Sequence, residues 1–256
     1  MKSLIKKTFN SKLGVDLRNL FGFHTVFLGK VLNESAGVSI SDAFPWRTDK
    51  GYKTTFKYAD ILNLFYKIQD SYVELFFYTN ENKLIKKIEI AHLDYSNELM
   101  IDKDFLNGIE GYGVFYIFHR CKDTYEVNLA ISNKCYVGFS VDNCLNSFVH
   151  GMSYVSYQTI DGKIKKSGLV LSSFFKKVYR VQNSFLEFTK TELFFANPSA
   201  KKINFSIGKE KYSIEKGCSI LIDIDSRDEL SILSNSMFFR PIIFNYKDVF
   251  LDVHHG

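Results

Sequence analysis

Residues 202–207 read KINFSI, and this stretch shows most clearly which fold class the chain belongs to. Apolar and polar residues alternate one by one in it, so Ile203, Phe205 and Ile207 face one way and the polar side chains face the other. That two-residue period is typical of an antiparallel sheet with one buried face and one wet face. We therefore predict a β-strand here.

Strand-like segments of the same kind recur along most of the chain. They are short, rich in β-branched and aromatic residues, and separated by clusters of Gly, Asn, Asp and Ser, as in all-β sandwiches. The segments are residues 53–58, 72–78, 84–90, 114–119, 135–141, 185–195, 219–224 and 241–246. Residues 60–66 fit either a helical turn or a strand. The sequence as a whole predicts an all-β fold.

The composition of the chain limits the classes of function. Of the 256 residues, 46% are hydrophobic and 16% aromatic, which predicts a folded core rather than disorder. A net charge of +5 is too small to indicate a nucleic-acid partner. No apolar run approaches the ~18 residues of a transmembrane helix, and the N-terminus lacks the apolar core of a signal peptide. We therefore expect a cytoplasmic protein whose cysteines are buried thiols.

Residues 2–21 predict a short basic amphipathic helix. Leucine, isoleucine and phenylalanine recur there at helical spacing, while lysine and arginine fill the other faces. Such a helix can lie on an anionic membrane surface, which would place the protein peripherally at the inner membrane face. The alternative is that its apolar stripe docks on the β core and its lysines face water.

Short blocks of sequence recur in the same order in the two halves of the chain. They are ELFF at 74–77 and 192–195, KKI at 86–88 and 201–203, ID at 101–102 and 222–223, and ISN or LSN at 131–133 and 233–235. Each half also closes on a His-Gly pair, at 150–151 and 255–256. Recurrence of this kind predicts an internal duplication.

The predicted architecture is two tandem, related antiparallel β-sandwich units preceded by the helix of residues 1–21. Roughly a hundred residues are enough for a small sandwich with its own core. The first unit covers residues 22–151, with an extra segment at about 103–130, and the second covers residues 152–256. No Pro- or Ser-rich linker separates them, which predicts tight packing between the two units.

The histidines offer one candidate site. The sequence lacks a phosphate-binding loop, a dinucleotide fingerprint, a nucleophile elbow and the HExxH zinc motif, so our first hypothesis is a protein without catalysis or cofactor. Under a pseudo-two-fold axis, however, His150 and His255 would occupy equivalent positions and could meet. With His119 and Asp252 they form a candidate site for a transition metal such as zinc. The simpler interpretation is that these histidines close strand ends with hydrogen bonds.

Arginine is scarce beside lysine in this chain, so each arginine is a candidate for bidentate recognition of a carboxylate or phosphate. Arg120 and Arg240 are two such candidates. A third, Arg47, lies between Trp46, the only tryptophan, and Asp49. A tryptophan ring can stack on a sugar while neighbouring polar groups bond its hydroxyls, so these three residues form a candidate glycan contact. The alternative is a tryptophan that fills one end of the sandwich.

The N-terminal stretch KSLIKKTFNSKLGVDLRNL resembles the leaders of enzymes encoded in bacterial surface-polysaccharide gene clusters. The strand-rich remainder, with SFVHG at 147–151 and DVHHG at 252–256, is similar to uncharacterised β-sandwich proteins of the same setting. The resemblance implies a glycan context, but it implies no reaction and no catalytic residues.

These observations lead to three hypotheses of function. The first is an accessory, non-catalytic β-sandwich protein that binds a glycan or a partner protein. The second is a metal-dependent enzyme that acts on sugars through the histidine site. The third is a structural protein of a phage or a surface layer, which would form oligomers.

Overall fold

A computed structural model of the chain describes residues 11, 31–32, 38–122, 125–126, 135–141, 144–152, 154–160, 163–168, 171–181, 188–199, 201–224, 230–237 and 239–256. The helix predicted over residues 2–21 lies outside this set, apart from Ser11. Strands dominate the residues that are described, which confirms the prediction of an all-β chain.

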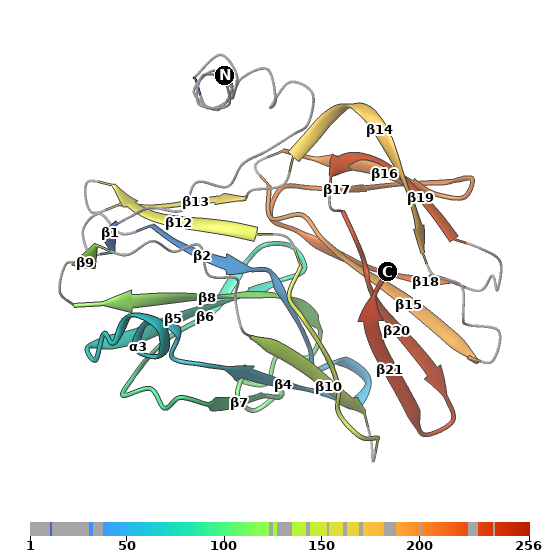
Figure 1. The fold of residues 1–256 in the computed structure, drawn as a ribbon. Helices are drawn as coiled ribbons and strands as arrows, with labels where there is room; N and C mark the ends of the chain where they lie inside the picture. Colours follow the sequence, from blue (N-terminus) through green and yellow to red (C-terminus); the bar gives the residue numbers. More distant parts are fainter. Residues whose placement is uncertain are drawn as a thin grey trace.

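Most strands belong to four sheets of four strands each (Figure 1). In hydrogen-bonded order, sheet I consists of β3 (Phe44–Arg47), β8 (Tyr112–Cys121), β5 (Ser71–Thr79) and β6 (Leu84–Ala91). Sheet II consists of β11 (Ser147–Val149), β10 (Tyr136–Val141), β4 (Tyr52–Tyr58) and β7 (Asn97–Ile101). Sheet III consists of β14 (Leu171–Val181), β19 (Leu230–Met237), β16 (Ile203–Ile207) and β17 (Glu210–Ile214). Sheet IV consists of β21 (Phe250–His255), β20 (Ile242–Lys247), β15 (Lys190–Ala196) and β18 (Ser219–Ile224).

Smaller elements connect these sheets. Sheet V consists of β13 (Lys163–Gly168), β12 (Tyr154–Ile160) and β2 (Val38–Asp42), and β1 (Val31–Leu32) pairs with β9 (Tyr125–Glu126). Because β2 pairs with β12, sheet V joins segments from both sides of the predicted boundary between residues 151 and 152. All strand pairs in the described part of the chain are antiparallel.

The segment that fits either a helix or a strand by sequence is a helix, α3 (Ile61–Tyr66). Asp60 begins it, because its carboxylate accepts a hydrogen bond of 3.0 Å from the backbone N–H of Asn63. Lys67 ends it in the left-handed conformation, with φ of 60°. Local capping therefore decides a segment whose periodicity is ambiguous.

The same strand order occurs twice along the chain. Sheets I and II contain one set of eight strands in chain order, β3 to β8 followed by β10 and β11, and sheets III and IV contain a second set, β14 to β21. In each set the first strand pairs with the sixth, the sixth with the third and the third with the fourth. In each set the eighth also pairs with the seventh, the seventh with the second and the second with the fifth. By this order β4 corresponds to β15, β5 to β16, β8 to β19 and β11 to β21.

This correspondence corrects the register in which the sequence blocks were matched. The ELFF block at 74–77 lies on β5, whereas the block at 192–195 lies on β15, the counterpart of β4. The two blocks therefore do not occupy equivalent places. The segment expected to be extra in the first half contains β8, which has a counterpart in β19. His150 and His255, in contrast, lie at the ends of the equivalent strands β11 and β21.

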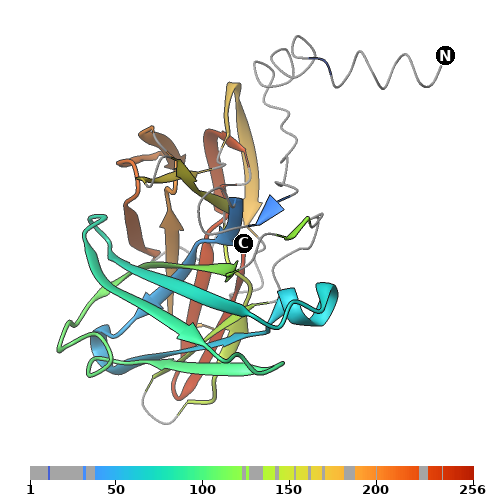
Figure 2. The same ribbon diagram turned by 90° about the vertical axis from the view of Figure 1, so that its left-hand side faces the viewer.

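Two hydrophobic clusters form the core, and sheet IV contributes to both. On one of its faces Phe195 packs on Phe205 of sheet III, with ring centroids 4.7 Å apart. On the other face Phe244 packs on Phe139 of sheet II, at 4.9 Å. Figure 1 and Figure 2 show the red strands β20 and β21 between β10 of sheet II and the remaining strands of sheet IV. The four sheets thus form a ring around shared cores, and two separate sandwiches are not clearly resolved.

Candidate functional site

The predicted glycan contact around Trp46 is buried. Trp46 and Arg47 lie on β3 and have relative exposures of 0%. The indole N–H of Trp46 donates a hydrogen bond of 2.8 Å to the carbonyl oxygen of Tyr78 on β5, which lies beyond β8 in sheet I. A sugar cannot stack on a ring that the core covers completely. In this structure Trp46 therefore fills the interior, as in the alternative interpretation of the sequence.

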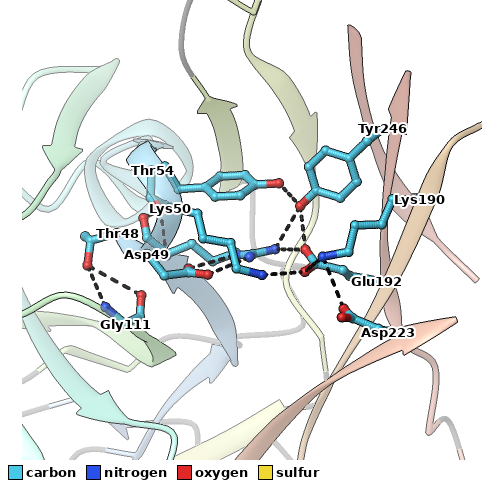
Figure 3. Close-up of polar contacts among 11 residues, drawn as sticks. Thr48, Asp49, Lys50, Thr54, Gly111, Lys190, Glu192, Asp223 and Tyr246 are labelled. Carbon is cyan, nitrogen blue, oxygen red and sulfur yellow. Dashed lines mark hydrogen bonds and ion pairs between the residues drawn. The ribbon is translucent and has the colours of Figure 1, made fainter. Parts of the chain in front are cut away.

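Arg47 forms ion pairs with Asp49 and Glu192 and so joins the two halves of the chain. We call this group of contacts the Arg47–Glu192 network; Figure 3 shows Asp49, Lys50, Lys190, Glu192, Asp223 and Tyr246 in it. The guanidinium of Arg47 donates two hydrogen bonds to Asp49, of 3.0 and 2.7 Å, and one of 2.6 Å to Glu192 on β15. The same group lies 4.0 Å from the ring centroid of Tyr52, so the cation also stacks on an aromatic face. Arginine, unlike lysine, can make all of these contacts at once because its donors form a planar fork.

Glu192 receives donors from both halves. Tyr246 of β20 donates to it at 2.5 Å, Lys190 at 2.7 Å and Lys50 at 3.3 Å, while the hydroxyl of Tyr52 bonds that of Tyr246. Burial alone would raise the pKa of the Glu192 carboxyl, but Arg47 and Lys190 outweigh it and lower the pKa to about 2. A carboxylate held ionised with so many donors is suited to fixing geometry rather than to accepting a proton.

The charges of this network are balanced. It contains the cations Arg47, Lys50 and Lys190 and the anions Asp49, Glu192 and Asp223. A buried charge is tolerated only when it is paired, and such pairs favour one arrangement of the parts they join. We therefore interpret the network as the element that sets how sheet IV sits against β3 and the 3-10 turn η1 (Asp49–Gly51).

Arg120 and His119, on β8, also lie in the interior. Arg120 donates to Glu74 at 3.1 Å, and Glu74 also binds Lys87 at 2.7 Å. Burial lowers the pKa of His119 to about 3, so its ring is neutral at physiological pH. Neither ring nitrogen of His119 has a hydrogen-bond partner among the described residues. His119 is thus not brought together with the other predicted metal ligands.

His150 and His255 do meet. The two histidines lie at the ends of β11 and β21, where Ser147 also accepts a hydrogen bond of 2.8 Å from the backbone N–H of Val253. The ring of His255 bonds the backbone of His150, while burial, followed by His150, Arg240 and His254, lowers its pKa. Figure 1 shows β21 beside the end of β10.

Asp252, the fourth predicted ligand, lies three residues before His255 on β21 but faces the other side of the sheet. Its carboxylate is 3.6 Å from the Nε2 atom of His254, and alternation along β21 points both away from His255. In the part of the chain that the structure describes, no group of three or more His, Cys, Asp or Glu side chains is placed to hold a metal ion. The four predicted metal ligands therefore lie in three separate places. His119 is in the interior, His150 is beside His255, and Asp252 is beside His254.

The outer face of sheet II presents a different group of residues, which we call the sheet II face: Lys57, Glu98, Met100, Tyr136, Phe148 and His150. Tyr136 is 42% exposed and Phe148 is 38% exposed, although both are large and apolar. The ring of Phe148 lies over Gly138, where an added Cβ would meet it at 2.5 Å. The ring centroids of Tyr136 and His150 are 4.4 Å apart. Tyr136 and His150 are thus in contact, and Phe148 is exposed on the same face of the sheet, two residues before His150.

Charged groups border these rings. Lys57 lies 5.1 Å from the ring centroid of Phe148 and forms an ion pair of 3.2 Å with Glu98 on β7. The strand pairing explains the arrangement, because Tyr136 is directly opposite Lys57, and Lys57 is directly opposite Glu98. One sheet face thus combines apolar rings with hydrogen-bonding groups at its edge.

The equivalent face of sheet IV is not available. Phe194, Ile242 and Phe244 lie on it with relative exposures of 0%, because it packs against the first half of the chain. Repeated strand order therefore yields one open face and one covered face. Within the described residues, the open one is the better candidate for binding a ligand.

Sequence reasoning did not identify Tyr136 and Phe148. The stretch CYVGFSV at 135–141 does contain a signal, since Val137 and Phe139 alternate with Tyr136 and Gly138. A tyrosine in the polar phase of an alternating strand predicts an outward ring. What the alternation cannot show is whether another part of the chain covers that ring.

No known protein family, curated protein or solved structure matches this chain. None of the helices in the described part of the chain has the length and apolar character needed to cross a bilayer.

Proposed function

We propose that this chain is a non-catalytic binding protein and that it holds a glycan on the sheet II face. The observation that carries the proposal is the pair of exposed rings, Tyr136 and Phe148, on neighbouring strands of one sheet. Large apolar side chains are normally buried, so their exposure on one continuous face favours a binding surface. The resemblance of the sequence to proteins of surface-polysaccharide clusters points in the same direction.

The chemistry of this face fits a sugar better than a purely apolar ligand. The faces of a pyranose ring present C–H bonds with partial positive charge, which the negative face of an aromatic ring attracts. The hydroxyls at the edge of the sugar need donors and acceptors, which Lys57 and Glu98 supply beside the rings. A sheet face with rings on β10 and β11 and polar groups on the adjoining strands β4 and β7 meets both needs.

We also infer that the chain consists of two related β-sandwich units, residues 22–151 and 152–256. The repeated order of eight strands supports this, since one duplication accounts for both sets. The equivalence is between strands and sheet positions rather than between the short blocks of similar sequence. An experimental structure in which sheets I and II do not superpose on sheets III and IV in this order would reject the inference.

A glycan array tests the binding function directly. We expect the wild-type protein to bind a subset of bacterial surface glycans, and we expect Tyr136→Ala and Phe148→Ala each to weaken that binding at least about tenfold, through loss of the stacked ring. Tyr95→Ala is the matched control, because Tyr95 is exposed but lies in the turn between β6 and β7. The absence of any glycan bound, or equal binding by all variants, would reject the proposal.

A second candidate function is assembly of several copies of the chain. It is favoured by Leu145 and Val249, which are exposed at the tips of the equivalent hairpins β10–β11 and β20–β21. The tips are adjacent, since the thiol of Cys144 contacts the carbonyl oxygen of Val249. If this function holds, light scattering will show oligomers that the double variant Leu145→Ser with Val249→Ser abolishes. A monomer at high concentration would exclude it.

A further inference from the structure

One end of the sheet II face carries an arginine and two histidines. His150, whose ring contacts Tyr136, lies there with His255 and Arg240, and we call this group the cationic end because Arg240 is permanently charged. The backbone explains why they meet: His255 pairs with Ile242 on β20, and the chain enters that strand through Arg240 and Pro241. The N–H of Gly256 donates at 3.0 Å to the carbonyl oxygen of Pro241 and holds the two segments together.

Among the described residues, no carboxylate forms an ion pair with Arg240, His150 or His255. Lys57 is paired with Glu98, and the nearby His254 faces Asp252, so both of those carboxylates are already engaged. Arg240 itself is exposed. Burial, followed by His150, Arg240 and His254, lowers the pKa of His255, which favours its neutral ring beside the Arg240 cation. An anion bound at this end would pair with Arg240, and imidazole N–H groups are suitable further donors to it.

We infer that the glycan held on the sheet II face is acidic, and that its anionic group binds at Arg240, His150 and His255. This inference rests on the proposed glycan-binding function. The rings of Tyr136 and Phe148 hold the sugar faces, and the cationic end recognises a carboxylate or a phosphate carried by the same glycan. Arg240 is suited to that recognition because its guanidinium can donate two parallel hydrogen bonds to either group.

The test is a glycan array with three arms of similar chain length: neutral glycans, glycans with uronic acid carboxylates and glycans with phosphate groups. We expect the bound glycans to fall in the acidic arms, and the arm that binds identifies the anionic group. We expect Arg240→Gln to weaken the best acidic ligand about tenfold, which is the loss of one charge-assisted contact. Arg180→Gln is the matched control, because Arg180 is an exposed arginine on β14.

Raised salt gives a second readout. Binding of the acidic ligand should weaken with ionic strength in the wild-type protein and depend less on salt in Arg240→Gln, because exposed charges are screened. Binding confined to neutral glycans, or an unchanged affinity in Arg240→Gln, would overturn this inference and leave the proposed function standing. A protein that binds no glycan in any arm would overturn both.

Discussion

Replacing Glu192 by glutamine tests whether the Arg47–Glu192 network joins the halves of the molecule. The change removes the negative charge but keeps the size of the side chain. In the folded protein the pKa of the Glu192 carboxyl is lowered from an ordinary value of 4.5 to about 2. Each pKa unit of lowering corresponds to about 1.4 kcal/mol of stabilisation, which gives roughly 3.4 kcal/mol in all. Lys50 and Lys190 are partly in water, which weakens their share. We therefore expect Glu192→Gln to lower the free energy of unfolding at pH 7 by about 2–3 kcal/mol.

The stability lost in Glu192→Gln should depend on pH, which distinguishes the loss of an ionised carboxylate from a change in packing. A carboxyl whose pKa is lower in the folded state stabilises the protein fully when the pH is above its pKa in the unfolded chain, here 4.5. That stabilisation is lost as the pH falls toward the folded-state pKa of about 2. The wild-type protein should therefore approach the variant in stability across this window. Urea denaturation at pH 7, 4.5 and 3 measures the difference in the free energy of unfolding, which we expect to be about 2–3, 2 and 1 kcal/mol respectively.

Glu110→Gln is the control for this experiment. Glu110 forms an ion pair of 2.9 Å with Lys103, but both side chains are 55% exposed, so we expect a loss below about 0.5 kcal/mol. If Glu192→Gln costs no more than Glu110→Gln, or if the difference does not narrow below pH 4.5, the reasoning about the network is wrong.

Two further predictions concern buried positions. Because burial lowers the pKa of His119 to about 3, this residue should make the wild-type protein lose stability as the pH falls from 6.5 toward 3. His119→Leu lacks that contribution, so between pH 7 and pH 5 it should lose about 2 kcal/mol less than the wild type by urea denaturation. A Cβ at Gly113 would lie 2.0 Å from the carbonyl oxygen of Tyr78 and 2.9 Å from the indole nitrogen of Trp46, so Gly113→Ala should destabilise the protein by on the order of 2 kcal/mol in the same assay. Equal pH profiles for His119→Leu and wild type, or a neutral Gly113→Ala, would contradict these expectations.

The sequence predicts individual strands well because alternation is a local property. In β16, Ile203, Phe205 and Ile207 are buried and Asn204 is exposed, as the KINFSI pattern predicts. The helix α3 is also decided locally, by its capping residue Asp60. Pairing of the strands depends on contacts between distant residues, and the short repeated blocks matched β5 to β15, which are not equivalent.

The candidate site is harder to predict, because exposure depends on which sheets cover each other. Arg47 was expected to contact a ligand, but it is buried and pairs with Glu192 instead. The two residues are 145 positions apart in the chain, so no local pattern predicts this pair. Tyr136 points away from the core and into solvent, as the alternation predicts. Tyr246 lies on the corresponding face of sheet IV, but there the first half of the chain covers it. Equivalence of His150 and His255 was predictable from the two His-Gly endings, and both do lie at one junction.

Sheet IV is covered on both sides, and this has a consequence for how the protein is made. During translation, residues 44–149 leave the ribosome before any strand of sheet IV has been synthesised. Phe139 and its neighbours are then still exposed, because Phe244 and the other sheet IV side chains that cover them are not yet present. Until the hairpin β20–β21 leaves the ribosome, the nascent first half therefore exposes apolar surface through which it can aggregate or bind a chaperone.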